Sequence, residues 1–376
     1  MKTFLSAIVL SFLIGLFPAK ANDGVFYAQG NSLFPLQETR IELRKEILKF
    51  FVRDFNYVDV DVYFEFYNPD GDRKLTVGFV SPPAMGDFGD EEFDHPRISN
   101  FTVVVNDESL EHKVAKMEDT SFNADELEVD GFDYVYYFDV NFKPGLNRVR
   151  HTYRFKGGGS VETMRDFDYQ ITTGKRWANK QIDDFTLELH LDEGIFNLPA
   201  RFVKGGKLAN WKIVGDGVMK TKAETFYEFD DATIRMAHLN RGYIELKEKN
   251  FRPDFDIHIS EFNWFTGRIE KMCKSGRKCL TDKEVERLGI LMSRSPGDYI
   301  EVVQLKELSK KELKMMRNFG FALRGYEFKS ADLKAFYSKF FWYKPDASLK
   351  AEDIELSEAE KAFIEKVRSV EALKRG

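Results

Sequence analysis

The chain has 376 residues, of which 43% are hydrophobic and 31% are charged, and its formal net charge is −6. A chain of this length is expected to form two or three domains. The balance of apolar and charged residues is typical of a globular protein and excludes a largely disordered one. The 36 Phe and 15 Tyr residues favour a strand-rich portion, because aromatic side chains pack well on pleated sheets.

Residues 1–21 have the pattern of a secretory signal peptide. Lys2 supplies a basic start, an apolar run extends from Phe4 to Phe17, and Ala19-Lys20-Ala21 is a small-residue cleavage signal. The apolar run of 14 residues is shorter than the roughly 20 residues that a membrane-spanning helix needs. We therefore expect cleavage near Ala21 and a mature chain that is extracytoplasmic, either periplasmic or secreted, with no transmembrane segment.

Residues 22–262 show the alternation of β-strands. In "YVDVDVYFEFYN" apolar and polar side chains alternate from Val58 to Phe66, which is typical of a strand with one buried face. Similar runs recur between turn signals such as Asn68-Pro69-Asp70-Gly71. We predict an antiparallel β-sandwich region, built as one sandwich or two. The composition of "IELRKEILKFF", residues 41–51, also suits a helix, although we favour a strand.

Residues 263–304 form a predicted helical linker region that contains the only two cysteines, Cys273 and Cys279. In an oxidising compartment a disulfide is favoured over two free thiols. A zinc site would need more ligands than these two side chains.

Residues 305–372 are predicted to be a small all-α domain. Three pairs have the spacing of helix-opening capping boxes: Thr281 with Glu284, Ser309 with Glu312, and Ser357 with Glu360. Apolar residues at Leu333, Phe336 and Phe340 suggest a further short helix, and Gly325 is expected to break the helix before it. Residues 306–350 hold 11 basic and 5 acidic residues, which either attract an anionic surface or simply form a solvated helix face.

The sequence carries few signals of catalysis or metal binding. The six histidines are scattered singly, and neither H-E-x-x-H nor G-x-S-x-G occurs. We therefore expect no catalytic residue, no metal, no cofactor and no nucleic acid partner. An envelope-polymer hydrolase with a carboxylate pair stays an alternative, and Asp87, Asp90, Glu91 and Glu92 are dispersed acids that could supply such a pair.

The segment "LSKKELKMMRNFGFALRGYEFKSADLKAFYSKFFWYKP", followed by "LSEAEKAFIEKV", resembles the bacterial YARHG domain. Phe321, Leu323 and Arg324 stand where that family has Tyr, Arg and His. The resemblance implies an extracytoplasmic module without an assigned activity. The strands "VDVYFEFYNPDGDRKLTVGFVSP" and "FRPDFDIHISEF" resemble a secreted bacterial family of unknown function, which implies an envelope protein without assigned catalytic residues.

These observations favour a non-enzymatic envelope protein that binds a cell-wall polymer or another envelope protein. A structural assembly subunit is a further alternative. We expect core packing for Trp342 and an exposed contact for Arg324, whereas Arg317 or Asn318 could instead bond helix-end carbonyls. The candidate binding residues are Arg317, Asn318, Arg324, Tyr326, Trp342 and Tyr343.

Overall fold

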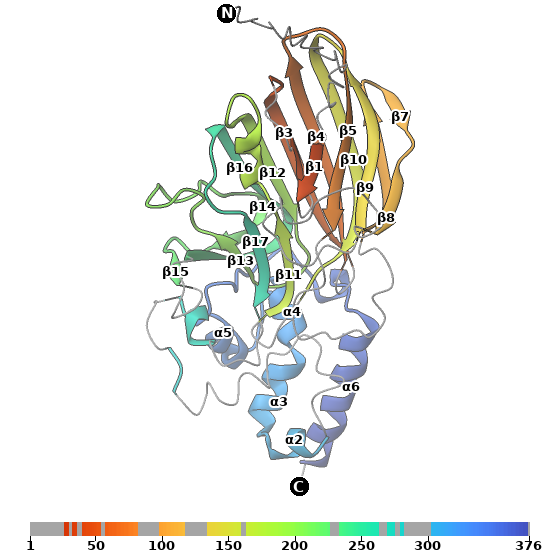
Figure 1. Ribbon diagram of the computed structural model, residues 1–376. Helices are drawn as coiled ribbons and strands as arrows, with labels where there is room; N and C mark the ends of the chain where they lie inside the picture. The colour runs from red at the N-terminus through yellow and green to blue at the C-terminus, as the bar shows by residue number, and fades with distance from the viewer. Residues whose placement is uncertain are drawn as a thin grey trace, which may run out of the picture.

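The computed structural model describes residues 26–29, 32–35, 40–53, 57–81, 98–116, 134–158, 163–225, 233–262, 269–274, 279–281 and 302–374. The predicted signal peptide, the acidic residues at 87–92 and the predicted cap residue Glu284 lie outside these ranges. Strands make up the upper part of the molecule in Figure 1, and the C-terminal helices lie below them.

The strands form two sheets, and most of their pairings are antiparallel, as predicted (Figure 1). The parallel pairs are β1 with β5 and β3 with β12. The smaller sheet has the order β2 (Ser32–Pro35), β1 (Phe26–Gln29), β5 (Arg73–Ser81), β9 (Tyr134–Phe142) and β8 (Lys113–Lys116). The larger sheet has the order β11 (Thr163–Tyr169), β17 (Ile257–Phe262), β13 (Phe196–Pro199), β16 (Thr233–Phe251), β12 (Ile182–His190), β3 (Glu42–Arg53), β4 (Tyr57–Asn68), β10 (Gly145–Lys156), β6 (Ile98–Val105) and β7 (Glu108–Leu110), and β14 (Lys212–Met219) and β15 (Glu224–Thr225) also pair with β16.

The alternation in β4 predicts its buried face correctly. Its apolar side chains are buried, whereas Asp59 and Asp61 lie on the outer face. These aspartates accept paired hydrogen bonds from Arg154 and Arg150 of β10, which stabilise neighbouring strands across the register. Inside the sandwich, the Phe66 ring contacts Phe64 of the same strand and Phe142 of β9 in the smaller sheet. Residues 42–53 form strand β3, so the preference for a strand there is confirmed.

Strand β16 connects two hydrophobic cores. Its C-terminal half pairs with β12 beside the sandwich, and its N-terminal end pairs with β13. Ile234 and Met236 of that end, together with Phe262 of β17, belong to a second core that they share with the C-terminal helices. The lower end of the large sheet is therefore the surface on which the helices pack.

The C-terminal region is helical, as predicted. Both described capping boxes are present, with Ser309 and Glu312 opening α3 and Ser357 and Glu360 opening α6. Among the helices in the described part of the chain, none is long and apolar enough to cross a membrane. The helices are α2 (Val302–Glu307), α3 (Lys310–Arg317), α4 (Phe319–Leu323), α5 (Ala331–Tyr337) and α6 (Glu358–Leu373), with short 3-10 helices η3 (Thr172–Arg176), η5 (Ile269–Met272) and η6 (Ala351–Asp353).

Cys273 and Cys279 form the predicted disulfide, and their Cα atoms lie 5.8 Å apart. Cys273 is buried in the second core and forms a β-bridge with Phe340, which follows α5. The disulfide loop is therefore attached to the C-terminal helical region.

The sandwich core contains an ionisable side chain, Glu46 of β3. Burial raises the pKa of Glu46 to about 8, although the hydrogen bond from Tyr169 partly opposes this shift. The folded protein therefore holds a proton on Glu46 at neutral pH. Because the folded-state pKa exceeds the ordinary value of 4.5, the unfolded chain loses this proton at a lower pH than the folded chain does.

We predict that Glu46→Gln makes the free energy of unfolding less dependent on pH. In the wild type, stability should fall between about pH 6.5 and 8. This window starts at the ordinary pKa of His151, 6.5, so the titration of that buried histidine does not obscure the effect of Glu46. The glutamine variant should be more stable at pH 8 by on the order of a few kcal/mol. Denaturant unfolding at several pH values tests this. Parallel stability curves for the two proteins would contradict it.

Candidate functional site

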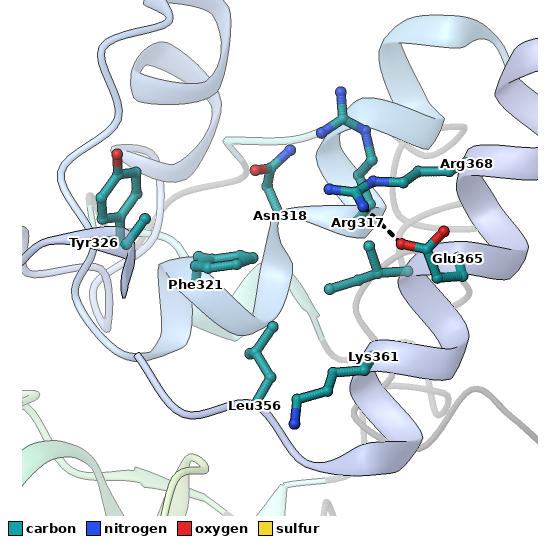
Figure 2. A pocket seen from close by; sticks show the side chains of 10 residues that line it. Arg317, Asn318, Phe321, Tyr326, Leu356, Lys361, Glu365 and Arg368 are labelled. Atoms are coloured by element: carbon teal, nitrogen blue, oxygen red, sulfur yellow. Dashed lines mark hydrogen bonds and ion pairs between the residues drawn. The ribbon is translucent and has the colours of Figure 1, made fainter. Parts of the chain in front are cut away.

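A groove of about 510 Å³ lies in the C-terminal helical region between α4 and α6 (Figure 2). This volume is in the range of small-molecule binding pockets. The groove is built by the end of α3, by α4, by the segment around η6 and by one face of α6. Its lining residues are Arg317, Asn318, Phe321, Tyr326, Ala351, Leu356, Lys361, Ile364, Glu365 and Arg368.

The floor of the groove is apolar. Phe321, Tyr326, Leu356 and Ile364 are all half-buried, and the rings of Phe321 and Tyr326 meet edge to face with their centroids 6.1 Å apart. These side chains leave part of their apolar surface open to a ligand, which could gain free energy by covering it.

The rim of the groove carries three basic side chains, each with a carboxylate partner in the chain. Arg317 pairs with Glu371 at 2.9 Å, and Lys361 pairs with Glu358 at 2.7 Å. Arg368 pairs with Glu365 at 2.6 Å, the contact drawn in Figure 2. Exposed pairs contribute only about 0–1 kcal/mol. A carboxylate or phosphate of a ligand can therefore replace the exposed Glu365 on Arg368 at low cost.

The structure separates the roles of Arg317 and Asn318. The side-chain amide of Asn318 donates to the carbonyl of Lys314 at 2.7 Å, so the predicted bond to a helix-end carbonyl is confirmed for this residue. Arg317 donates to Glu371 of α6. Both side chains line the groove, and their hydrogen bonds hold the end of α3 in place beside it.

Trp342 and Tyr343 lie below the groove rather than in it. Trp342 is fully buried, and its ring meets Phe319 edge to face, so the predicted core packing of Trp342 is confirmed. The Tyr343 hydroxyl donates to the carbonyl of Tyr326 at 2.9 Å. Neither side chain lines the groove, and Tyr343 contacts one of the residues that do, Tyr326.

The groove lies in a segment that resembles a known domain family. Residues 289–372 match the YARHG domain. The resemblance seen in the sequence is confirmed, and every residue that lines the groove falls inside the matched range. A comparison with curated proteins gave no match.

Solved structures share only a distant likeness with the chain. A Legionella pneumophila protein, provisionally described as nutrient-binding, is 18% identical, with a TM-score of 0.48 over 93% of this chain and 100% of that one. An M1 zinc metallopeptidase from Deinococcus radiodurans is 11% identical, with a TM-score of 0.23 over 59% of this chain and 42% of that one. Yeast LTA4 hydrolase is 7% identical, with a TM-score of 0.26 over 59% and 29%. These scores support no functional argument.

Arg324 of the YARHG domain is not the exposed contact that the sequence suggested. Its side chain is only 14% exposed. The guanidinium binds both carboxylate oxygens of Glu360 at 2.8 and 3.0 Å, and its Nε donates to Glu193 at 3.1 Å. Glu193 lies in the loop between β12 and β13. The prediction of exposure was wrong because this partner is 131 residues away in the sequence.

Seven of the ten residues that line the groove were not among the candidates from the sequence. Lys361, Ile364, Glu365 and Arg368 of α6 lie at spacings of three and four residues, so they share one face of the helix. That spacing is the available signal, but it is equally typical of a solvated face. Within the described residues, no group of three or more His, Cys, Asp or Glu side chains could hold a metal ion.

We predict that Arg324→Ala lowers the stability of the YARHG domain. The substitution leaves Glu360, which is only 14% exposed, without its guanidinium partner, and this should cost about 2–3 kcal/mol. Thermal and denaturant unfolding measure the loss. Lys329→Ala is the matched control, because Lys329 is exposed in the same domain and should change stability by less than about 0.5 kcal/mol. Equal effects of the two substitutions would show that the Arg324 ion pairs are dispensable.

Proposed function

We propose that this protein is an extracytoplasmic, non-enzymatic interaction protein of the bacterial cell envelope. The groove of the YARHG domain is its binding surface, and its ligand is an anionic wall polymer. The proposal rests on one observation: the groove brings half-buried aromatic and aliphatic side chains together with the basic side chains of arginine and lysine. The predicted signal peptide supports the extracytoplasmic location.

The groove suits a ligand that combines an acidic group with an apolar or flat surface. Arg317 and Arg368 offer planar guanidinium groups, which bind carboxylates and phosphates through two parallel hydrogen bonds. Phe321 and Tyr326 offer partly exposed aromatic rings beside them, on which the apolar face of a sugar or a short side chain can rest.

The composition of the groove supports binding rather than hydrolysis. A hydrolase of the predicted kind needs two carboxyl groups with different proton affinities on either side of the scissile bond. Of the ten residues that line the groove, Glu365 is the one acid, and it is paired with Arg368. The groove therefore offers a ligand hydrogen-bond donors and apolar surface, not an acid and base pair.

We predict that the double variant Arg317→Glu/Arg368→Glu is retained far less by insoluble, purified cell-wall polymer than the wild type is. Wild-type retention should be stronger at low than at high salt, because screening weakens contacts between exposed charges. The matched control is Lys310→Glu/Lys329→Glu, which makes the same change in charge at exposed positions outside the groove.

Comparison of the two double variants distinguishes specific binding in the groove from a general effect of charge on retention. Equal losses in the two double variants would show that overall charge alone drives retention. Wild-type protein that is not retained at low salt would overturn the choice of ligand. Circular dichroism of each variant verifies that it is folded.

A further inference from the structure

We propose that His238 is doubly protonated in the folded protein and forms a proton-dependent contact between the large sheet and the YARHG domain. His238 lies on β16 and is 1% exposed. Its Nδ1 is 2.6 Å from the carbonyl oxygen of Gly194, and its Nε2 is 2.7 Å from the carbonyl oxygen of Leu323. Gly194 belongs to the sheet region, whereas Leu323 ends α4 in the YARHG domain.

The chemistry of imidazole decides its charge at this position. Neutral imidazole carries one N–H donor, and its other nitrogen presents a lone pair. A carbonyl oxygen is an acceptor, so the neutral ring would satisfy one contact and place a lone pair against an oxygen in the other. The imidazolium donates at both nitrogens. At separations of 2.6 and 2.7 Å, two N–H donors account for both contacts.

The sheet side of the contact holds two carboxylates on one arginine. Arg165 of β11 binds both carboxylate oxygens of Asp192 at 2.6 and 2.9 Å and binds Glu261 of β17 at 2.7 Å. Asp192 lies two residues before Gly194, and the Glu261 carboxylate packs against Gly194 itself. Among the described residues, this cluster joins two carboxylates to one guanidinium.

The helical side has the same composition. Arg324 follows Leu323 directly and is bound by Glu193 and Glu360, again two carboxylates for one guanidinium. On the neighbouring strand β14, Asp216 pairs with Lys344, and the rings of Trp342 and His238 meet edge to face with their centroids 6.1 Å apart. A proton on His238 therefore places a positive charge between two groups of residues that, within the described part of the chain, each join two carboxylates to one guanidinium.

The sign of the pH dependence follows from these contacts. The proton strengthens the bonds to Gly194 and Leu323 in the folded state, so docking of the YARHG domain is most stable at acidic pH. Stability falls as the pH rises and the folded-state imidazolium loses its proton. The contact then keeps one donor, and the attachment of α4 to the sheet weakens.

Nitrogen NMR of the imidazole rings tests the charge directly in the wild-type protein. We expect both ring nitrogens of His238 to show the protonated shift at about pH 7, whereas an exposed histidine near its ordinary pKa of roughly 6.5 is then mostly neutral. The signal is assigned by its absence in His238→Gln. A neutral ring with one protonated nitrogen at that pH would overturn the proposal.

Unfolding measurements test the consequence for docking. The difference in Tm between the wild type and His238→Gln should be largest at about pH 5.5 and should shrink towards about pH 9, as expected for a stabilising imidazolium. Glu46 is present in both proteins, so its contribution cancels from this difference. A Tm difference that stays constant over the range would show that the proton has no part in docking.

Discussion

The three residues Asp192, Glu193 and Gly194 connect the large sheet to the YARHG domain, and the rest of the arrangement depends on how they are held. Arg165 binds Asp192 from the sheet. Arg324 binds Glu193 from the helical side, and the Gly194 carbonyl meets His238. Because Arg324 also binds Glu360 near the start of α6, the same contacts set where α6 lies and therefore where one wall of the groove stands.

Charged groups at such a junction are costly to bury, and an apolar interface of the same volume can be as stable. Ion pairs instead restrict the orientation of the two parts. A two-bond contact such as that of Arg165 with Asp192 accepts one orientation, whereas apolar surfaces tolerate sliding. The second core already supplies apolar contact between β16 and the helices. The arginine clusters therefore serve to fix the register of the YARHG domain on the sheet.

Local patterns in the sequence predict most elements but few of their partners. The alternation in β4, the capping boxes of α3 and α6 and the cysteine pair each depend on residues close in the chain, and each is confirmed. Of the six candidate binding residues, Arg317, Asn318 and Tyr326 line the groove. Arg324, Trp342 and Tyr343 do not, and of these Arg324 was expected to make an exposed contact. Its environment is set by Glu193, which no local pattern brings near.

The stretch from Arg317 to Tyr326 serves two surfaces at once. Arg317, Asn318, Phe321 and Tyr326 face the groove, whereas Leu323 O, Arg324 and Gly325 face the sheet. Gly325 has φ +80°, and a side chain there would come within 3.0 Å of the Lys344 carbonyl. Since α4 is little more than one turn long, its two faces cannot move independently. A shift of α4 on the sheet must therefore displace Phe321 in the floor of the groove.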